Sequence, residues 1–110
     1  MKTFAGAVDL GATNVRVAFI SREGKVIGKI SRETPRSGKN GNVVAEMIGD
    51  MVSELCSKYP TIRLQGIGIA SLGPLDYKRG GPTKPPNLPY VFVSLVVPLQ
   101  KRFSIPVLLH

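Results

Sequence analysis

The start of the chain constrains the fold most, because three strand-like segments follow one another with only short turns between them. Residues 4–10 form a short apolar segment, and residues 15–20 show the period of two that is typical of a strand. Residues 26–34 carry polar side chains on one face. Gly24 lies in the second turn, where a positive φ is useful. Strands joined by tight turns pair antiparallel. We therefore expect an antiparallel unit of three strands.

A single long amphipathic helix is predicted after this unit. Residues 35–41, PRSGKNG, have the composition of a loop. From residue 43 to residue 59, apolar side chains recur in pairs every four positions, which is close to the helical period. Asn42 is the expected N-cap, and Pro60 ends the helix. The acidic residues lie on the opposite face: Glu46, Asp50 and Glu54.

The remainder of the chain predicts two further strands and a short helix. Residues 65–70 form a fourth strand, and residues 72–90 an irregular loop with five prolines. Ser94 is the expected cap of a helix that ends near residue 103, and residues 105–110 begin a fifth strand. Strands that are entered through helices run parallel. The expected fold class is α/β: a mixed five-stranded sheet in the order β-β-β-α-β-α-β.

Composition excludes several classes of protein. The 110 residues suit one domain, and 43% hydrophobic residues can fill its core. Cys56 is the only cysteine, so an internal disulfide and a cysteine zinc site are excluded. No apolar run is long enough to span a bilayer, and the N-terminus lacks the pattern of a signal peptide. We expect a soluble, cytoplasmic protein with no membrane partner.

The net charge of +8 raises the question of an anionic partner. The basic residues cluster within one segment of the chain: Arg22, Lys25, Lys29, Arg32, Arg36 and Lys39. Nucleic-acid binding would require interleaved aromatics or a recognition helix, but aromatics make up only 6% of the chain and the long helix is acidic. We therefore interpret the cluster as a solvated face and expect no nucleic-acid partner. It can also complement an acidic second lobe, or reflect the charge-rich surface of a thermophile.

The first segment with chemical character is VDLGATNVRV, where an acidic residue ends a buried strand and a tight hairpin follows. Gly11 and Ala12 let the backbone approach an anion closely, so that amide groups can bind a phosphate. Thr13 and Asn14 add side-chain donors, and Asp9 can hold Mg²⁺ through water. The alternative is an ordinary β-turn in which Asp9 caps a backbone amide, and this segment alone does not decide between the two.

The second segment is GIGIASLGPLD, followed after a short interval by KPPNLP. Prolines restrict this backbone, which suits a site that holds small polar groups in place around a ligand. The amide of Asn87 can both donate to and accept from a sugar hydroxyl, and Ser71 and the backbone of Gly73 offer similar groups. The alternative is a proline-stiffened surface loop.

Together, the two segments resemble the N-terminal lobe of a ROK-family sugar kinase, especially the archaeal glucokinase- or hexokinase-like members. VDLGATNVRVA is similar to the family's first phosphate motif, Asp-x-Gly-x-Thr followed by Asn or Lys. GIGIASLGPLD with PPNLP resembles the stretch that leads to its sugar-binding loop, and FSIPVLLH resembles the strand before its Asn-Asp pair. The resemblance covers essentially all 110 residues. It implies the ribonuclease-H-like lobe of the actin and sugar-kinase superfamily.

The resemblance implies a role for each residue of the first motif, with ATP and Mg²⁺ as cofactors. Asp9, Gly11, Thr13 and Asn14 would lie at the ATP phosphates, with Asp9 toward the magnesium ion. Ala12 replaces a glycine common in relatives, a small change that should preserve phosphate approach.

The second motif would bind the sugar, a hexose for which glucose is the first expectation. Gly73, Asn87 and Ser71 would lie near it. Arg16 falls within the phosphate motif, but we expect it to have a structural role on its strand.

The catalytic base of the family, the Asp of the Asn-Asp pair, would follow His110, and His110 itself is no substitute. Residues 1–110 are therefore expected to be the N-terminal lobe of a kinase, inactive alone, with the C-terminal lobe absent. A lobe without its partner exposes apolar surface, so we expect self-association. The alternative function is a non-catalytic sugar- or nucleotide-binding module, either a ROK regulator or an actin-like assembly unit.

Overall fold

The computed structural model describes residues 2–38 and 40–110, so Lys39 of the basic cluster lies outside the described residues. In chain order the elements are β1 (Lys2–Leu10), β2 (Asn14–Ser21), β3 (Val26–Glu33), α1 (Asn42–Lys58), β4 (Ile62–Ser71), β5 (Leu75–Asp76), β6 (Gly81–Pro82), α2 (Val96–Phe103) and β7 (Val107–Leu109). Among these described elements, neither helix combines the length and apolar character that crossing a membrane requires.

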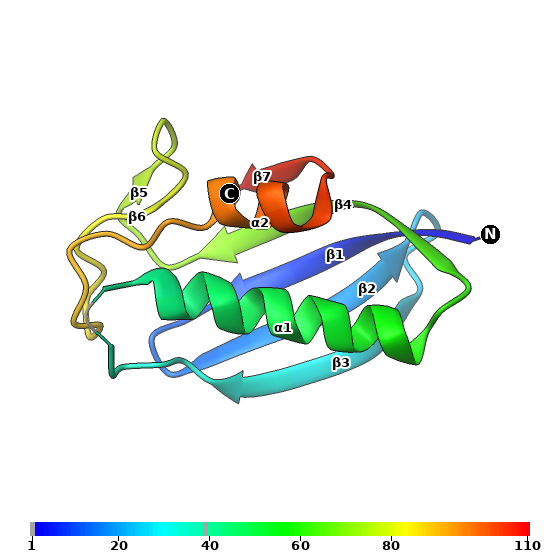
Figure 1. The fold of residues 1–110 in the computed structure, drawn as a ribbon, viewed down its shortest axis with the longest axis horizontal. Coiled ribbons are helices and arrows are strands. Elements are labelled where there is room, and N and C mark those ends of the chain that lie inside the picture. The colour runs from blue at the N-terminus through cyan, green and yellow to red at the C-terminus, as the bar shows by residue number, and fades with distance from the viewer. Residues whose placement is uncertain (1, 39) are drawn as a thin grey trace.

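The main sheet has five strands in the order β3-β2-β1-β4-β7. β1 pairs antiparallel with β2, and β2 with β3, as the short turns predict. β1 pairs parallel with β4, and β4 with β7, because each connection passes through a helix. The mixed sheet expected from the sequence is therefore confirmed. The carboxyl ends of β1, β4 and β7 point toward the same edge, on the left in Figure 1.

The core lies between the sheet and α1, which crosses the sheet in Figure 1. Val8, Val17 and Ile67 project from three neighbouring strands onto this face and are buried. α1 packs against them through these buried members of its predicted apolar stripe: Val44, Ile48, Met51, Val52 and Leu55. Ala45 and Gly49 of α1 are buried as well, and Gly49 lies against Arg102 of α2. α2 lies beside α1, where the Arg102 guanidinium is 2.9 Å from the Asp50 carboxylate. The acidic face of α1 is exposed, as expected.

The two predicted helix caps are wrong. Asn42 is already helical, the N-cap is Gly41, and no side chain caps it. Gly41 is buried against Val93, so tertiary packing determines where α1 begins. Leu95, not Ser94, is the N-cap of α2, and the amides of Leu95 and Val96 both donate to the Gly80 carbonyl at 3.0 Å. A backbone carbonyl from another loop therefore replaces the side-chain cap.

Three strand features were not predicted. β3 contains a bulge at Gly28, which has φ 64° and lies under Leu55 and Tyr59 of the α1 end. β4 begins at Ile62, before the predicted start at residue 65. The predicted irregular loop contains the small β5–β6 hairpin, which projects from the main sheet in Figure 1.

Candidate functional site

The hairpin of residues 11–14 joins β1 to β2 at the carboxyl end of β1. The Gly11 amide closes it by donating to the Asn14 carbonyl at 3.0 Å. Thr34, which follows β3 and is buried, donates from its backbone to the Thr13 carbonyl at 2.9 Å and from its hydroxyl to the Gly11 carbonyl at 2.7 Å. No pattern in the sequence marks Thr34 as a site residue, yet Thr34 holds the hairpin from the side of β3.

The carbonyl and amide groups of this hairpin differ in their bonding. The Ala12 carbonyl accepts a hydrogen bond from Arg36 at 2.7 Å, so three consecutive carbonyls, from Gly11 to Thr13, are bonded to the protein. Within residues 2–38 and 40–110, the amides of Ala12 and Thr13 donate to no acceptor. Successive free amides in a turn are the groups that bind anions. The hairpin therefore has the donors that a phosphate site requires.

Asp9 lies beside the hairpin on the face of the sheet away from α1. Its carboxylate is 3.7 Å from the guanidinium of Arg16, its cross-strand partner, and both side chains are more than 60% exposed. Asp9 therefore pairs with Arg16. It is not bonded to a backbone amide of the described hairpin, whereas the ordinary-turn alternative requires such a bond. An exposed ion pair of this kind adds little stability.

The donor set near Asp9 fits magnesium of the kind that accompanies nucleotides. The described residues contain no group of three or more Asp, Glu, His or Cys side chains that would form a cage for a metal ion. Mg²⁺ bound with a nucleotide instead uses one or two carboxylates, several waters and the phosphates. One exposed carboxylate next to free amides meets this requirement, and Asp9 would be that ligand.

The end of β4 lies next to the end of β1. Ser71 is the register partner of Leu10, and the Leu72 amide donates to the Leu10 carbonyl at 2.9 Å. The Ser71 hydroxyl donates to the Leu72 carbonyl, and Gly73 follows in an exposed position. Ligand sites of α/β sheets lie at the carboxyl ends of parallel strands. Ser71 and Gly73 are therefore at the same edge as Asp9 and the hairpin.

Asn87 reaches this edge from the proline-rich loop. The loop is closed by the Lys84 amide, which donates to the Val91 carbonyl at 2.7 Å, and Asn87 is exposed with φ 65°. The Arg36 guanidinium donates to the Asn87 carbonyl at 2.5 Å and, through its other terminal nitrogen, to Ala12. The two predicted motifs are thus brought together by one side chain.

Sequence reasoning missed Arg36 as part of this site. It was assigned to the solvated basic cluster, and Arg22 and Lys25 of that cluster are indeed exposed. Arg36 is exposed as well, yet it bonds two backbone carbonyls. Backbone acceptors leave no pattern in the sequence, so no signal marks this residue.

Two other reactive side chains lie outside this constellation. Cys56 packs against the core, where burial raises the pKa of its thiol and so lowers the thiolate fraction. This fits the predicted core role. His110 is exposed after β7, and its amide donates to the Ile69 carbonyl at 2.7 Å.

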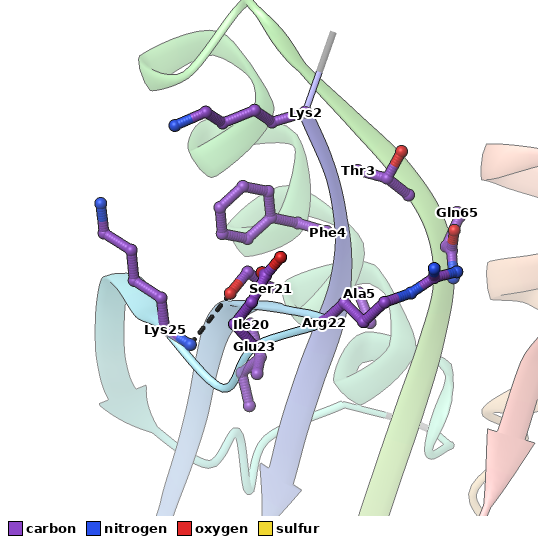
Figure 2. Close-up of a pocket in the computed structure, with 10 residues that line it drawn as sticks. All are labelled: Lys2, Thr3, Phe4, Ala5, Ile20, Ser21, Arg22, Glu23, Lys25 and Gln65. Atoms are coloured by element: carbon purple, nitrogen blue, oxygen red, sulfur yellow. Dashed lines mark hydrogen bonds between the residues drawn. The ribbon is translucent and has the colours of Figure 1, made fainter.

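A hollow of about 730 Å³ lies at the opposite end of β1 (Figure 2). Its lining includes Lys2, Phe4, Arg22 and Lys25. In Figure 2, Arg22 extends toward Gln65, while the two lysines lie on the other side of Phe4, so the basic groups do not converge. The hollow's nearest lining residue on β1, Ala5, lies six residues before Gly11 of the hairpin, which is about 20 Å along an extended strand. The hairpin edge is therefore the candidate site.

Comparison with known proteins identifies the family of the chain. Residues 5–110 match the ROK family. A glucokinase of Aeropyrum pernix is 34% identical over 102 residues, which are 88% of this chain and 28% of the relative. The chain therefore spans less than a third of the length of that relative.

Solved structures agree with the fold over nearly the whole chain. The ROK hexokinase from Thermus thermophilus superposes with a TM-score of 0.81 at 26% identity, covering 97% of this chain and 34% of that one. A ROK family glucokinase from Streptomyces griseus, in complex with glucose and AMPPNP, has a TM-score of 0.72 at 22% identity over 97% and 32%. A ROK family transcriptional regulator, a homolog of the E. coli MLC protein, has a TM-score of 0.83 at 16% identity over 99% and 28%.

The last two likenesses show the fold alone, because their identities are low. The fold class expected from the sequence, the α/β lobe of the sugar-kinase type, is confirmed. From the match over residues 5–110, the chain belongs to the ROK family.

Proposed function

We propose that this chain is the N-terminal, ATP-phosphate- and sugar-binding lobe of an ATP-dependent glucokinase-like hexose kinase. The observation that carries the proposal is the hairpin with free amides at Ala12 and Thr13, beside the Asp9 carboxylate and bonded through Arg36 to the Asn87 loop. A phosphate donor and a hydroxyl acceptor have to meet at one place in a kinase. The similar glucokinase of Aeropyrum pernix supports the substrate class.

The phosphates of ATP would bind at the hairpin. The backbone amides of residues 11–14 and the side chains of Thr13 and Asn14 would donate to the phosphate oxygens. Asp9 would hold Mg²⁺ through water, and the ion, when bound, neutralises charge on the transferring phosphoryl group.

The hexose would lie between the end of β4 and the Asn87 loop. The amide of Asn87 would orient sugar hydroxyls, with Ser71 and the backbone of Gly73 as further partners. The Streptomyces griseus relative was solved with glucose and AMPPNP, which supports this pair of ligands as candidates here.

The catalytic base would lie beyond His110. Since β7 runs parallel to β4 and β1, a residue that follows β7 would emerge at the same edge as Ser71 and Asp9. A carboxylate at that position could take the proton from the sugar hydroxyl as it attacks the γ-phosphate. Residues 1–110 alone are therefore proposed to be inactive.

A coupled glucose-phosphorylation assay with ATP and Mg²⁺ tests the proposal on both the 110-residue chain and the full-length protein that carries it. We expect turnover from the full-length protein only. Turnover by the 110 residues alone would refute the proposal that the catalytic base lies beyond His110.

Calorimetric titration with glucose would separate the alternatives. Sugar binding by the full-length protein without phosphorylation would favour a non-catalytic sugar-binding module, and nucleotide-driven polymerisation would favour an actin-like assembly unit.

A further inference from the structure

The segment of residues 34–36 connects the hairpin to the Asn87 loop. Thr34 donates two hydrogen bonds to the hairpin, Arg36 donates one to the hairpin and one to the loop, and the Pro35 carbonyl accepts from the Tyr90 hydroxyl at 2.8 Å. Tyr90 is buried, so this last contact fixes the far side of the loop. We call residues 34–36 the brace.

Within the brace, Arg36 is the residue whose side chain bonds both segments. Its Nη2 donates to the Ala12 carbonyl at 2.7 Å and its Nη1 to the Asn87 carbonyl at 2.5 Å. These two acceptors are far apart in the sequence. The planar guanidinium presents its donors in a fixed fork, so the two carbonyls are held at a defined separation.

We propose that Arg36 is a positioning residue that holds the hairpin and the Asn87 loop as one unit, so that nucleotide and hexose favour each other's binding. The ligand part of this inference rests on the proposed function. A ligand that orders one loop also orders the other through Arg36, and the second ligand then loses less conformational freedom on binding. Arg36 itself need touch neither ligand.

Substitution by lysine distinguishes positioning by the planar Arg36 guanidinium from simple attraction of phosphate by a positive charge. Lysine keeps the charge but presents one compact ammonium group, which cannot reproduce the planar two-nitrogen contact. Arg36→Lys should therefore behave like Arg36→Gln. Arg22→Gln is the matched control, because Arg22 is an exposed arginine in the hollow at the opposite end of β1.

The first experiment needs no ligand. Hydrogen–deuterium exchange of the full-length protein that carries this chain would follow the bonded amides of the two segments, which are those of Gly11 in the hairpin and of Lys84 and Leu88 in the loop. Both Arg36 variants should exchange about fivefold faster than wild type in both segments, while Arg22→Gln leaves both unchanged. Faster exchange in only one segment, or in neither, would overturn the proposal.

The second experiment measures coupling in the same variants. The Kd for AMPPNP is determined with and without saturating glucose, and wild type should bind about fivefold more tightly with glucose. This factor should fall to about one in both Arg36 variants and persist in Arg22→Gln. Retention of full coupling in Arg36→Lys would refute the fork argument.

The two experiments can fail separately. A wild-type protein that binds neither glucose nor AMPPNP would refute the proposed function, and the exchange data would still decide whether Arg36 holds the two loops together.

Discussion

The side chains proposed to meet ligands contribute little to stability. Asp9 is 62% exposed with one distant ion-pair partner, and Asn87 is exposed. By contrast, the residues that position them are bonded: Thr34 is buried, and Arg36 bonds two carbonyls. Substitutions at Asp9 and Asn87 can therefore be interpreted through binding and activity.

Asp9→Asn should abolish most activity of the full-length protein without unfolding it. We expect kcat/KM to fall about 100-fold, because the neutral amide is a poor magnesium ligand. The free energy of unfolding should change by less than about 1 kcal/mol, since the Asp9–Arg16 pair is exposed. Arg16→Gln breaks the same ion pair but keeps the carboxylate, so it should retain activity. Equal losses in both variants, measured in the coupled assay, would contradict magnesium binding by Asp9.

Asn87→Gly should weaken hexose binding selectively. Asn87 has φ 65°, a left-handed conformation that glycine adopts readily, so the change removes the amide group and keeps the backbone. The Kd for glucose should rise about tenfold. The Kd for AMPPNP should stay within about twofold, because the carbonyl that Arg36 bonds remains.

Lys84→Gly is the matched control for this loop, since Lys84 also has a positive φ of 44°. Titration calorimetry of the full-length protein should show unchanged glucose affinity. If Lys84→Gly weakens glucose binding as much as Asn87→Gly does, loop flexibility and not the Asn87 amide explains the loss.

Single residues of the site could be predicted only where they belong to a motif. The glycine and hydroxyl residues after β1 predict an anion site because their chemistry is local. The brace residues Thr34 and Arg36 act on carbonyls distant in the sequence, and a carbonyl is the same in every residue type. The sequence pattern therefore does not indicate the roles of Thr34 and Arg36.

At the scale of elements, the bulge in β3 gives the clearest test of packing. A Cβ at Gly28 would lie 2.7 Å from both Leu55 and Tyr59, and its φ of 64° is already unfavourable for alanine. Gly28→Ala should therefore lower the free energy of unfolding by about 2–4 kcal/mol. Gly24 also has a positive φ, of 88°, but open space around its Cβ position.

Gly24→Ala should lower the free energy of unfolding by only about 1–2 kcal/mol, which is the cost of placing alanine at a positive φ. Urea denaturation of both variants would measure the difference. Equal losses would show that α1 does not press on β3 at Gly28.

Element types were predictable because each signal is periodic and local. The paired apolar positions of α1 and the alternation in β3 both match the structure. Element ends were less predictable, because Gly41 is fixed by Val93 and the start of α2 by the Gly80 carbonyl. These contacts depend on the fold being complete, so tertiary packing overrides the local cap signals at Asn42 and Ser94.

At the scale of the whole molecule, the two helices leave one face of the sheet uncovered within the described residues. Alternate positions there hold small side chains such as Ala7 and Gly68, and Leu108 of the edge strand β7 is 62% exposed. Away from the Asp9–Arg16 pair, this face is built from small residues and ends at an exposed apolar edge strand, a combination that favours association with another chain.

The isolated 110-residue chain should therefore self-associate through this face. Leu108→Lys should shift it toward monomer, because a charge on the face opposes burial. Val97→Lys is the control, since Val97 is exposed on α2, on the opposite side. Light scattering after size-exclusion chromatography measures both. A wild-type chain that is monomeric at high concentration would contradict the prediction.

The central place of β1 also affects how the lobe forms during synthesis. Of the five strands of this sheet, the middle strand β1 is made first, and its second edge can pair only when β4 appears about 50 residues later. At ordinary translation rates this interval lasts roughly 3–10 s. During that time the β1–β2–β3 unit carries an open apolar edge, and we expect nascent chains that lack β4 to be the species most dependent on chaperones. The order in which the strands are made, and not only their final contacts, therefore determines when this lobe is vulnerable.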